Sequence, residues 1–275
     1  MNLGSLAISL SDCRLNDNRL VGIIPDALLK SSSLQHLSLQ NNFLVGPIPS
    51  IPSSLSNPSN FTYSGNNFCS DRPGVACSPE TAALLSFLDG VNYPLHLLYT
   101  WGGDDPCGSA SWLGVACDPR GNNVVSINLP NSTLNGTISP DLANLTHLTR
   151  IVLRGNNLYG GIPSSLTKLT SLVLLDVSNN NLYGPLPSFN TTRVNLIVTG
   201  NPNINNLMPS SSSLPIQSNS GPNVVHNAKT SSRFPPSAIV GIVLGMFGIL
   251  LLVGGSIFCF LMYKRKRVRS RVQSP

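Results

Sequence analysis

Charged residues are scarce in this sequence: they make up 10% of its 275 residues, and the formal net charge is +6. A basic excess of this size can indicate a nucleic-acid partner. Here, however, six of the 17 basic residues lie within positions 264–271, and the remaining 11 equal the 11 acidic residues in number. Residues 1–263 therefore carry no net charge, and this charge pattern excludes a nucleic-acid-binding surface in them.

Catalytic and metal-binding arrangements are also missing from the sequence. The four histidines lie at positions 36, 96, 147 and 226, and no spacing among them is that of a metal site. There is no glycine-rich phosphate loop, no H-R-D and no D-F-G, the motifs of protein kinases. Asp104 and Asp105 are adjacent carboxylates, but no partner for acid–base catalysis accompanies them. We therefore predict a non-enzymatic chain with no catalytic residue, no metal site and no cofactor.

One template, L-x-x-L-x-L-x-x-N-x-L-x-G-x-I-P, recurs along the chain, twice at a spacing of 24 residues. Further copies begin at Leu10 and Val124, the second with Ser132 in the asparagine position, and a degraded copy begins at Phe61. The three fullest copies contain LQNNFLVGPIP at 39–49, LRGNNLYGGIP at 153–163 and VSNNNLYGPLP at 177–187.

A leucine pattern with a period in the twenties is the signature of a leucine-rich repeat solenoid. The L-x-L positions alternate, which predicts a short strand with its leucines facing inward. The asparagine can satisfy backbone groups where the chain leaves the strand, and the glycine permits the turn that follows. Cys13 occupies a leucine position, so we expect it to be buried as a small hydrophobic residue. Because one coil cannot bury its own leucines, the coils must stack, and we predict an α/β solenoid of short parallel strands.

The outward positions of stacked strands form a continuous concave surface, on which solenoids bind their partners. Charged side chains at these positions could anchor a polar or anionic protein surface, although simple solvation explains them equally well. An apolar residue at an outward position, Leu174, indicates contact with a partner. The predicted partner-binding residues are His36, Gln40, Arg150, Arg154, Leu174 and Asp176.

A long uncharged run occupies residues 238–263. About 20 apolar residues suffice to span a bilayer as a helix. The basic residues that follow mark the cytoplasmic side and can bind anionic lipid, so the residues before the helix should lie outside. Gly241 and Gly245 form a G-x-x-x-G pattern through which two helices can dimerise, although glycine is common in membrane helices. We therefore predict a single-pass plasma-membrane protein with its amino terminus outside.

Cysteines and sequons agree with an extracellular location. Cys69 and Cys77 are close in sequence, as are Cys107 and Cys117, and in an exported chain such spacings favour two local disulfides. No histidine clusters with them, which argues against a metal site. Five asparagines open N-x-S/T sequons without proline and are predicted glycosylation sites. They are Asn60, Asn131, Asn135, Asn144 and Asn190.

The segment between the two groups of repeats has a different character. Ser78 is a predicted N-cap, followed by Pro79 at the first helical position and an apolar helix that ends at Gly90. The next stretch, LLYTWGGDDPCGSASWLGVAC, resembles the amino-terminal cap of plant leucine-rich repeat proteins. The residues that carry this resemblance are Trp101, Cys107, Trp112, Gly114, Val115 and Cys117. A solenoid needs a cap because its end would otherwise expose leucines.

Two repeat blocks with a cap between them, followed by a membrane helix, resemble the transmembrane-kinase (TMK) subfamily of plant leucine-rich repeat receptor-like kinases, over about residues 5–270. The resemblance implies an ectodomain in cell-surface signalling, including auxin responses through apoplastic auxin-binding proteins, and a cytoplasmic kinase. The chain departs from that pattern in having no kinase motif and in starting directly inside a repeat. We expect a receptor-like protein without its own kinase that binds a protein, peptide or hormone-carrier partner, or a co-receptor kinase. The alternative is a non-functional truncated fragment or incomplete gene model of a receptor-like serine/threonine kinase.

The expected organisation has six parts. They are a first repeat block at 1–68, truncated at its start, a cysteine-bearing island and cap at 69–120, a second repeat block at 121–201, a flexible stalk at 202–237, the transmembrane helix at 238–263 and a basic cytoplasmic tail at 264–275.

Overall fold

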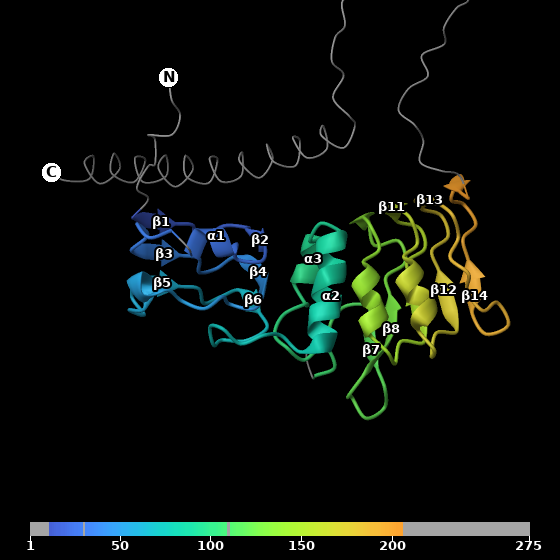
Figure 1. Ribbon diagram of the computed structural model, residues 1–275, viewed down its shortest axis with the longest axis horizontal. Helices are drawn as coiled ribbons and strands as arrows, with labels where there is room; N and C mark the ends of the chain where they lie inside the picture. The colour runs from blue at the N-terminus through green and yellow to red at the C-terminus, as the bar shows by residue number, and fades with distance from the viewer. Residues whose placement is uncertain (1–10, 30, 109–110, 206–275) are drawn as a thin grey trace, which may run out of the picture.

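The computed structural model describes residues 11–29, 31–108 and 111–205, and Figure 1 shows two stacks of short strands on either side of two helices. We call residues 11–68 the first solenoid, residues 69–120 the cap and residues 121–205 the second solenoid. Within each solenoid, neighbouring strands are parallel and come from successive repeats. The prediction of a solenoid of short parallel strands is therefore confirmed for the described residues.

Each coil of the first solenoid contributes a strand to two different sheets. The first sheet contains β1 (Asp12–Arg14), β3 (His36–Ser38) and β5 (Phe61–Thr62). The second contains β2 (Val21–Gly22), β4 (Phe43–Gly46) and β6 (Asn67–Phe68). Short helical turns, α1 (Asp26–Leu29) and η2 (Ser53–Leu55), return the chain to the first sheet.

The second solenoid repeats this plan over more coils. Its first sheet contains β8 (Val124–Asn128), β10 (Arg150–Val152), β12 (Leu174–Asp176) and β14 (Asn195–Ile197). Strand β7 (Val115–Cys117) of the cap joins this sheet by pairing antiparallel with β8. Its second sheet contains β9 (Asn135–Gly136), β11 (Asn157–Gly160), β13 (Asn181–Gly184) and β15 (Asn203–Ile204). The connecting turns are η3 (Pro140–Asn144) and η4 (Ser164–Lys168). Strand β15 lies in the segment assigned to the stalk from sequence, so the sheet continues beyond the predicted boundary at residue 201.

The inward leucine positions are buried. Leu37 and Leu175 are 0% exposed, and Cys13, in a leucine position, is 1% exposed. Full burial of an aliphatic side chain contributes about 1.5–3 kcal/mol, so these repeated positions supply much of the stabilisation. The buried residues form one cluster in the first solenoid and a larger one that joins the cap to the second solenoid.

Asparagine side chains tie each coil to the one before it. The Asn180 Nδ2 group donates to the carbonyl oxygens of Leu153 and Val177, both at 3.0 Å, and its Oδ1 atom accepts the Leu158 N–H at 3.0 Å. Leu153 and Leu158 belong to the preceding coil. The same three-way arrangement occurs at Asn42, Asn66, Asn156 and Asn201. The predicted role of the asparagine, to satisfy backbone groups beside the strand, is therefore confirmed.

The template glycine has the positive φ that its turn requires. Gly160 has φ +81°, and a Cβ added there would lie 3.2 Å from the Thr137 side chain. We expect Gly160→Ala to lower the free energy of unfolding by about 1–2 kcal/mol, the cost of a left-handed backbone for an L-residue. Gly161→Ala is the matched control, since a Cβ there would meet only the Tyr183 carbonyl oxygen at 3.7 Å. Equal urea midpoints for the two variants would contradict the prediction.

The cap contains α2 (Pro79–Gly90) and α3 (Leu95–Leu98). Ser78 accepts the Thr81 N–H and Pro79 opens α2, as predicted from the sequence. Helix α2 buries its apolar side chains, including Leu84 and Phe87, in the same cluster as the leucines of the second solenoid. The cap thus covers the end of the second solenoid.

The first solenoid contacts the other side of the cap through its second sheet. Phe43 of β4 packs edge-on against Tyr99, with ring centroids 5.3 Å apart, and the Asn67 Nδ2 group donates to the Leu98 carbonyl oxygen at 2.6 Å. Val45 is buried in the large cluster that contains the cap helices. Burial, followed by the hydrogen bond and negative charge of Asp89, raises the pKa of Tyr93 above its ordinary value.

Among the described residues, no helix is long and apolar enough to cross a membrane. The span predicted at 238–263, the Gly241 and Gly245 pattern and the basic tail all lie outside the described residues.

Candidate partner-binding surface

The first sheet of the second solenoid presents the outward residues of β10 and β12 side by side. The parallel register pairs Arg150 with Leu174 and Val152 with Asp176. Side chains alternate along a strand, and Ile151 and Leu175 face inward with 0% exposure, so their neighbours face outward. Ile197 of β14 continues the row that contains Val152 and Asp176. The structure therefore brings four of the predicted residues, Arg150, Arg154, Leu174 and Asp176, onto one face.

This face combines apolar area with positive charge. Val152, Leu174 and Ile197 are partly exposed, whereas Arg150 and Arg154 are exposed. Arg150 begins β10 and Arg154 lies two residues beyond its end, so their Cα atoms are about 13 Å apart at the rise of an extended chain. Within the part of the chain that the structure describes, neither guanidinium forms an ion pair with a carboxylate. Both can therefore contact acidic groups of a partner.

Asp176 is held in place by its neighbour. Its Oδ1 atom accepts the Ser178 hydroxyl at 2.6 Å and the Ser178 N–H at 3.1 Å. The carboxylate therefore lies beside the apolar row without neutralising the arginines. Val152 and Ile197 were absent from the predicted set, although their places in the repeat template identify them as outward positions.

The first solenoid has a separate outward face with different chemistry. His36 is exposed and Gln40 is partly exposed, as predicted for outward positions. The Arg14 guanidinium and the Asp12 carboxylate form an ion pair at 3.0 Å. These residues belong to a different sheet from Arg150 and Leu174, so the six predicted residues do not form one surface.

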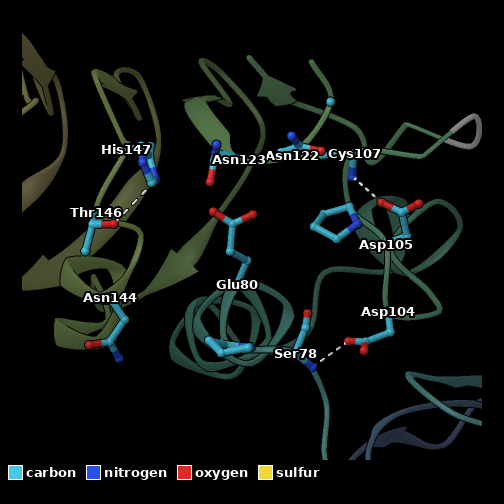
Figure 2. Close-up of a pocket in the computed structure, with 13 residues that line it drawn as sticks. Ser78, Glu80, Asp104, Asp105, Cys107, Asn122, Asn123, Asn144, Thr146 and His147 are labelled. Atoms are coloured by element: carbon cyan, nitrogen blue, oxygen red, sulfur yellow. Dashed lines mark hydrogen bonds between the residues drawn. The ribbon is translucent and has the colours of Figure 1, made fainter. Parts of the chain in front are cut away.

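A pocket of about 420 Å³ lies where the start of α2 meets the second solenoid. Its polar residues, shown in Figure 2, were not predicted as a site. Both carboxylate oxygens of Glu80 accept the Val124 N–H, at 3.1 and 3.2 Å. Asp104 accepts the Ser78 N–H at 2.7 Å and Asp105 accepts the Cys107 N–H at 3.1 Å, so each adjacent carboxylate is bound to a different backbone group. Glu80 therefore joins the cap to β8, whereas Asp104 and Asp105 bind backbone groups within the cap.

A loop at the edge of this pocket is stabilised by a carboxylate. Asp118 accepts the Asn123 side-chain N–H at 2.7 Å and the Asn122 backbone N–H at 3.0 Å. The side-chain hydrogen bond, followed by the backbone one, holds the pKa of Asp118 below its usual value. The loop joins β7 to β8 and therefore helps to anchor the cap.

Both expected cysteine pairs are disulfides in the structure. Cys69 bonds to Cys77, and Cys107 bonds to Cys117. Each disulfide closes a short loop, and in the loop-entropy model this stabilises the fold by about 2–3 kcal/mol. The Asp104 carboxylate lies near the sulfur atoms of Cys69 and Cys77, but the disulfide leaves no thiolate there to bind a metal.

The five sequon asparagines lie at surface positions. Asn131, Asn135, Asn144 and Asn190 are exposed, and Asn60 is partly exposed. Their glycosylation stays a prediction.

Sequence profiles of known families match parts of the chain. The profile described as leucine rich repeat N-terminal domain matches residues 77–118, which contain both cap helices and the Cys107–Cys117 disulfide. The leucine rich repeat profile matches residues 33–55 and 147–169, one coil in each solenoid.

Relatives with known names are plant receptor kinases. The chain is 41% identical to receptor-like kinase TMK4 of Arabidopsis thaliana over 54% of its own length and 15% of that protein. It is 43% identical to receptor protein kinase WSS1 of Oryza sativa subsp. japonica over 50% of its length and 14% of that protein. The solved PEPR1–AtPEP1 complex aligns at 30% identity with a TM-score of 0.38, covering 43% of this chain and 17% of that one. The chain thus spans about one seventh of these two named kinases, and over half of its own length it is similar to the leucine-rich repeat region of plant receptor-like kinases.

Proposed function

We propose that this chain is the ligand- or partner-recognition part of a plant cell-surface receptor-like protein of the TMK subfamily. Its solenoids lie outside the cell, and residues 238–263 anchor it as a single-pass membrane protein. A basic tail contacts anionic lipid, and the G-x-x-x-G pattern offers a dimer contact. The six-part organisation predicted from sequence, with the stalk starting after β15, belongs to this proposal. Recognition without catalysis is the role proposed for the solenoids.

The observation that carries this proposal is the outward face of the second solenoid. Val152, Leu174 and Ile197 offer partly exposed apolar area, and Arg150 and Arg154 offer charge that no carboxylate of the described residues neutralises. Apolar contact combined with charge suits a protein or peptide surface that carries acidic groups, such as a peptide ligand, a hormone-carrier protein or a co-receptor kinase.

We expect random displayed peptides, selected on the immobilised 275-residue chain, to be enriched in acidic residues next to apolar ones. The double variant Arg150→Ser/Arg154→Ser should weaken binding of a selected peptide at least about tenfold. Each charge-assisted hydrogen bond contributes about 1.5–3 kcal/mol, and about 1.4 kcal/mol is a factor of ten in Kd. Kd measured by isothermal titration at two salt concentrations checks this, because exposed charges are screened by salt.

Arg120→Ser is the matched control, since Arg120 is an exposed arginine in the β7–β8 loop of the cap. Its Kd should equal that of the unmodified chain. Unchanged affinity in the double variant, or selection of peptides without acidic residues, would show that this face is not the recognition surface.

A glycosidase band shift tests the extracellular location. The chain, expressed in plant cells with a carboxy-terminal tag, should lose mass on treatment with a glycosidase if the five sequons have entered the secretory pathway. The absence of a shift would favour the alternative, in which these residues are part of a receptor-like kinase that is not exported in this form. An in-frame kinase-coding segment directly downstream of residue 275 would support that alternative.

A further inference from the structure

Asn60 lies on the outward face of the first solenoid. Strand β5 pairs with β3 so that Phe61 is opposite Leu37, and the Leu37 N–H donates to the Asn60 carbonyl oxygen at 2.7 Å. Phe61 is buried, so Asn60 beside it faces outward, as His36 does on β3, whereas the hydroxyl of Thr62 is itself buried. Asn60 is therefore the lateral neighbour of His36.

The side chain of Asn60 is available for modification. It opens the sequon Asn60-Phe61-Thr62. Among the described residues, no hydrogen bond engages its amide group, in contrast to the buried asparagines that tie the coils together. Its Nδ2 atom can thus displace the pyrophosphate leaving group from the anomeric carbon of a lipid-linked oligosaccharide, with formation of an N–C bond and release of one N–H proton. The secretory pathway supplies that oligosaccharide.

The face around Asn60 has the chemistry of a sugar-contacting surface. Asp12 and Arg14 neutralise each other, and the other outward residues carry hydroxyl, amide or imidazole groups. Such groups both donate and accept hydrogen bonds, as sugar hydroxyls do. Strands lie about 4.8 Å apart, so the three strands β1, β3 and β5 make a face only about 10 Å wide. A branched glycan of several sugar rings is larger than this face.

Three of the other four sequons lie away from the strands that form the outward face of the second solenoid. Asn135 lies on β9 of the second sheet and Asn144 ends η3, on the return side of the coil. Asn190 lies outside the strands of the first sheet. Asn131 lies at the edge of the face, because its backbone N–H donates to the Arg154 carbonyl oxygen at 2.9 Å. None of the four belongs to β8, β10, β12 or β14.

We propose that an N-linked glycan on Asn60 covers the outward face of the first solenoid around His36 and makes it inaccessible to protein partners. The outward face of the second solenoid is then the surface left for recognition. This inference rests on the proposed extracellular location, and it assigns opposite roles to the two solenoids.

The test uses the 275-residue chain exported by plant cells behind a cleavable signal peptide, so that natural export is not at issue. Glycan release by a glycoamidase in heavy-oxygen water converts occupied asparagines to labelled aspartates, which mass spectrometry identifies site by site. Diethyl pyrocarbonate then reports the accessibility of His36, and its reaction rate is compared with that in chains from which the Asn60 sequon has been removed.

We expect Asn60 to be occupied and His36 to react more slowly in the unmodified chain than in chains without this sequon. Asn60→Gln and Thr62→Ala both remove the sequon, so each should accelerate the His36 reaction several-fold. Asn144→Gln, which removes a sequon on the return side of the coil, should leave the His36 rate unchanged.

Two results would overturn the inference while leaving the extracellular location intact. One is an unmodified Asn60 in a chain whose other sequons are occupied. The other is an occupied Asn60 with equal His36 rates in the unmodified chain and in Asn60→Gln. Failure of the unassisted chain to show a band shift would instead count against the proposed location.

Discussion

Replacing Asn180 with leucine should lower the free energy of unfolding by about 2–4 kcal/mol, because the buried Leu158 N–H is left without a partner, which costs about 1–3 kcal/mol, and two further hydrogen bonds are lost. The carbonyl oxygens of Leu153 and Val177 each keep one donor, from Asn156 and Asn201. Asn180 is 8% exposed and serves the Leu158 N–H and the carbonyl oxygens of Leu153 and Val177. Leucine has similar bulk but no hydrogen-bonding group, so all three backbone groups would lose this partner. Equilibrium urea unfolding, followed by circular dichroism, measures the change.

Asn181 provides the matched control for this substitution, since it is the next residue and is exposed on β13. Asn181→Leu should change the stability by less than about 0.5 kcal/mol, as surface substitutions usually do. Asn180→Ser should fall between the two, because a hydroxyl reaches fewer partners than an amide. Equal midpoints for Asn180→Leu and Asn181→Leu would show that these hydrogen bonds do not stabilise the stack.

We expect Trp101→Ala to destabilise the chain by about 3–5 kcal/mol, the usual range for removing a buried tryptophan. Trp101 is 0% exposed, stacks on Trp112 at a centroid distance of 5.2 Å, and packs against Phe87 of α2 at 6.2 Å. Its indole N–H donates to the Leu113 carbonyl oxygen at 3.0 Å. The substitution would leave a large cavity between Phe87 of α2 and Trp112. Thermal unfolding followed by near-ultraviolet circular dichroism reports the loss.

Tyr99→Ala is the comparison for Trp101→Ala, because Tyr99 is an aromatic residue of the same segment that is 69% exposed. It should cost about 1 kcal/mol through its edge-on contact with Phe43. Trp101→Phe keeps an aromatic ring in the cap and should cost less than Trp101→Ala. A Trp101→Ala variant as stable as Tyr99→Ala would mean that the cap core contributes little to the stability of the second solenoid.

The repeated elements could be predicted because their cause is local and periodic. Every full copy of the template has the inward leucines, the asparagine and the glycine at the same spacing, so one physical explanation applies to each of these coils. The strands, the burial of Cys13, the role of Asn180 and the start of α2 at Pro79 all follow from residues within a single repeat or a single turn.

The candidate surface could be predicted only in part. Arg150, Arg154, Leu174 and Asp176 were expected at outward positions; the register places Arg150, Leu174 and Asp176 on one sheet, and Arg154 follows β10 directly. The sequence did not separate them from His36 and Gln40, because the same template position occurs in both solenoids. The end of the second solenoid could not be predicted from the template. Strand β15 forms because Asn203 and Ile204 pair with β13, although their segment no longer follows the template.

The repeated residues alone predict a stack of leucine-rich coils with a cap in mid-chain. The folded chain was needed to show that the second sheet of the first solenoid packs on the cap through Phe43, Tyr99 and Asn67, and that Asn60 lies beside His36. The contacts between the first solenoid and the cap join residues from distant parts of the chain that share no repeat period. Which residues meet there depends on the shapes of the two folded surfaces. The direction of the Asn60 side chain depends on the strand register of the stacked coils.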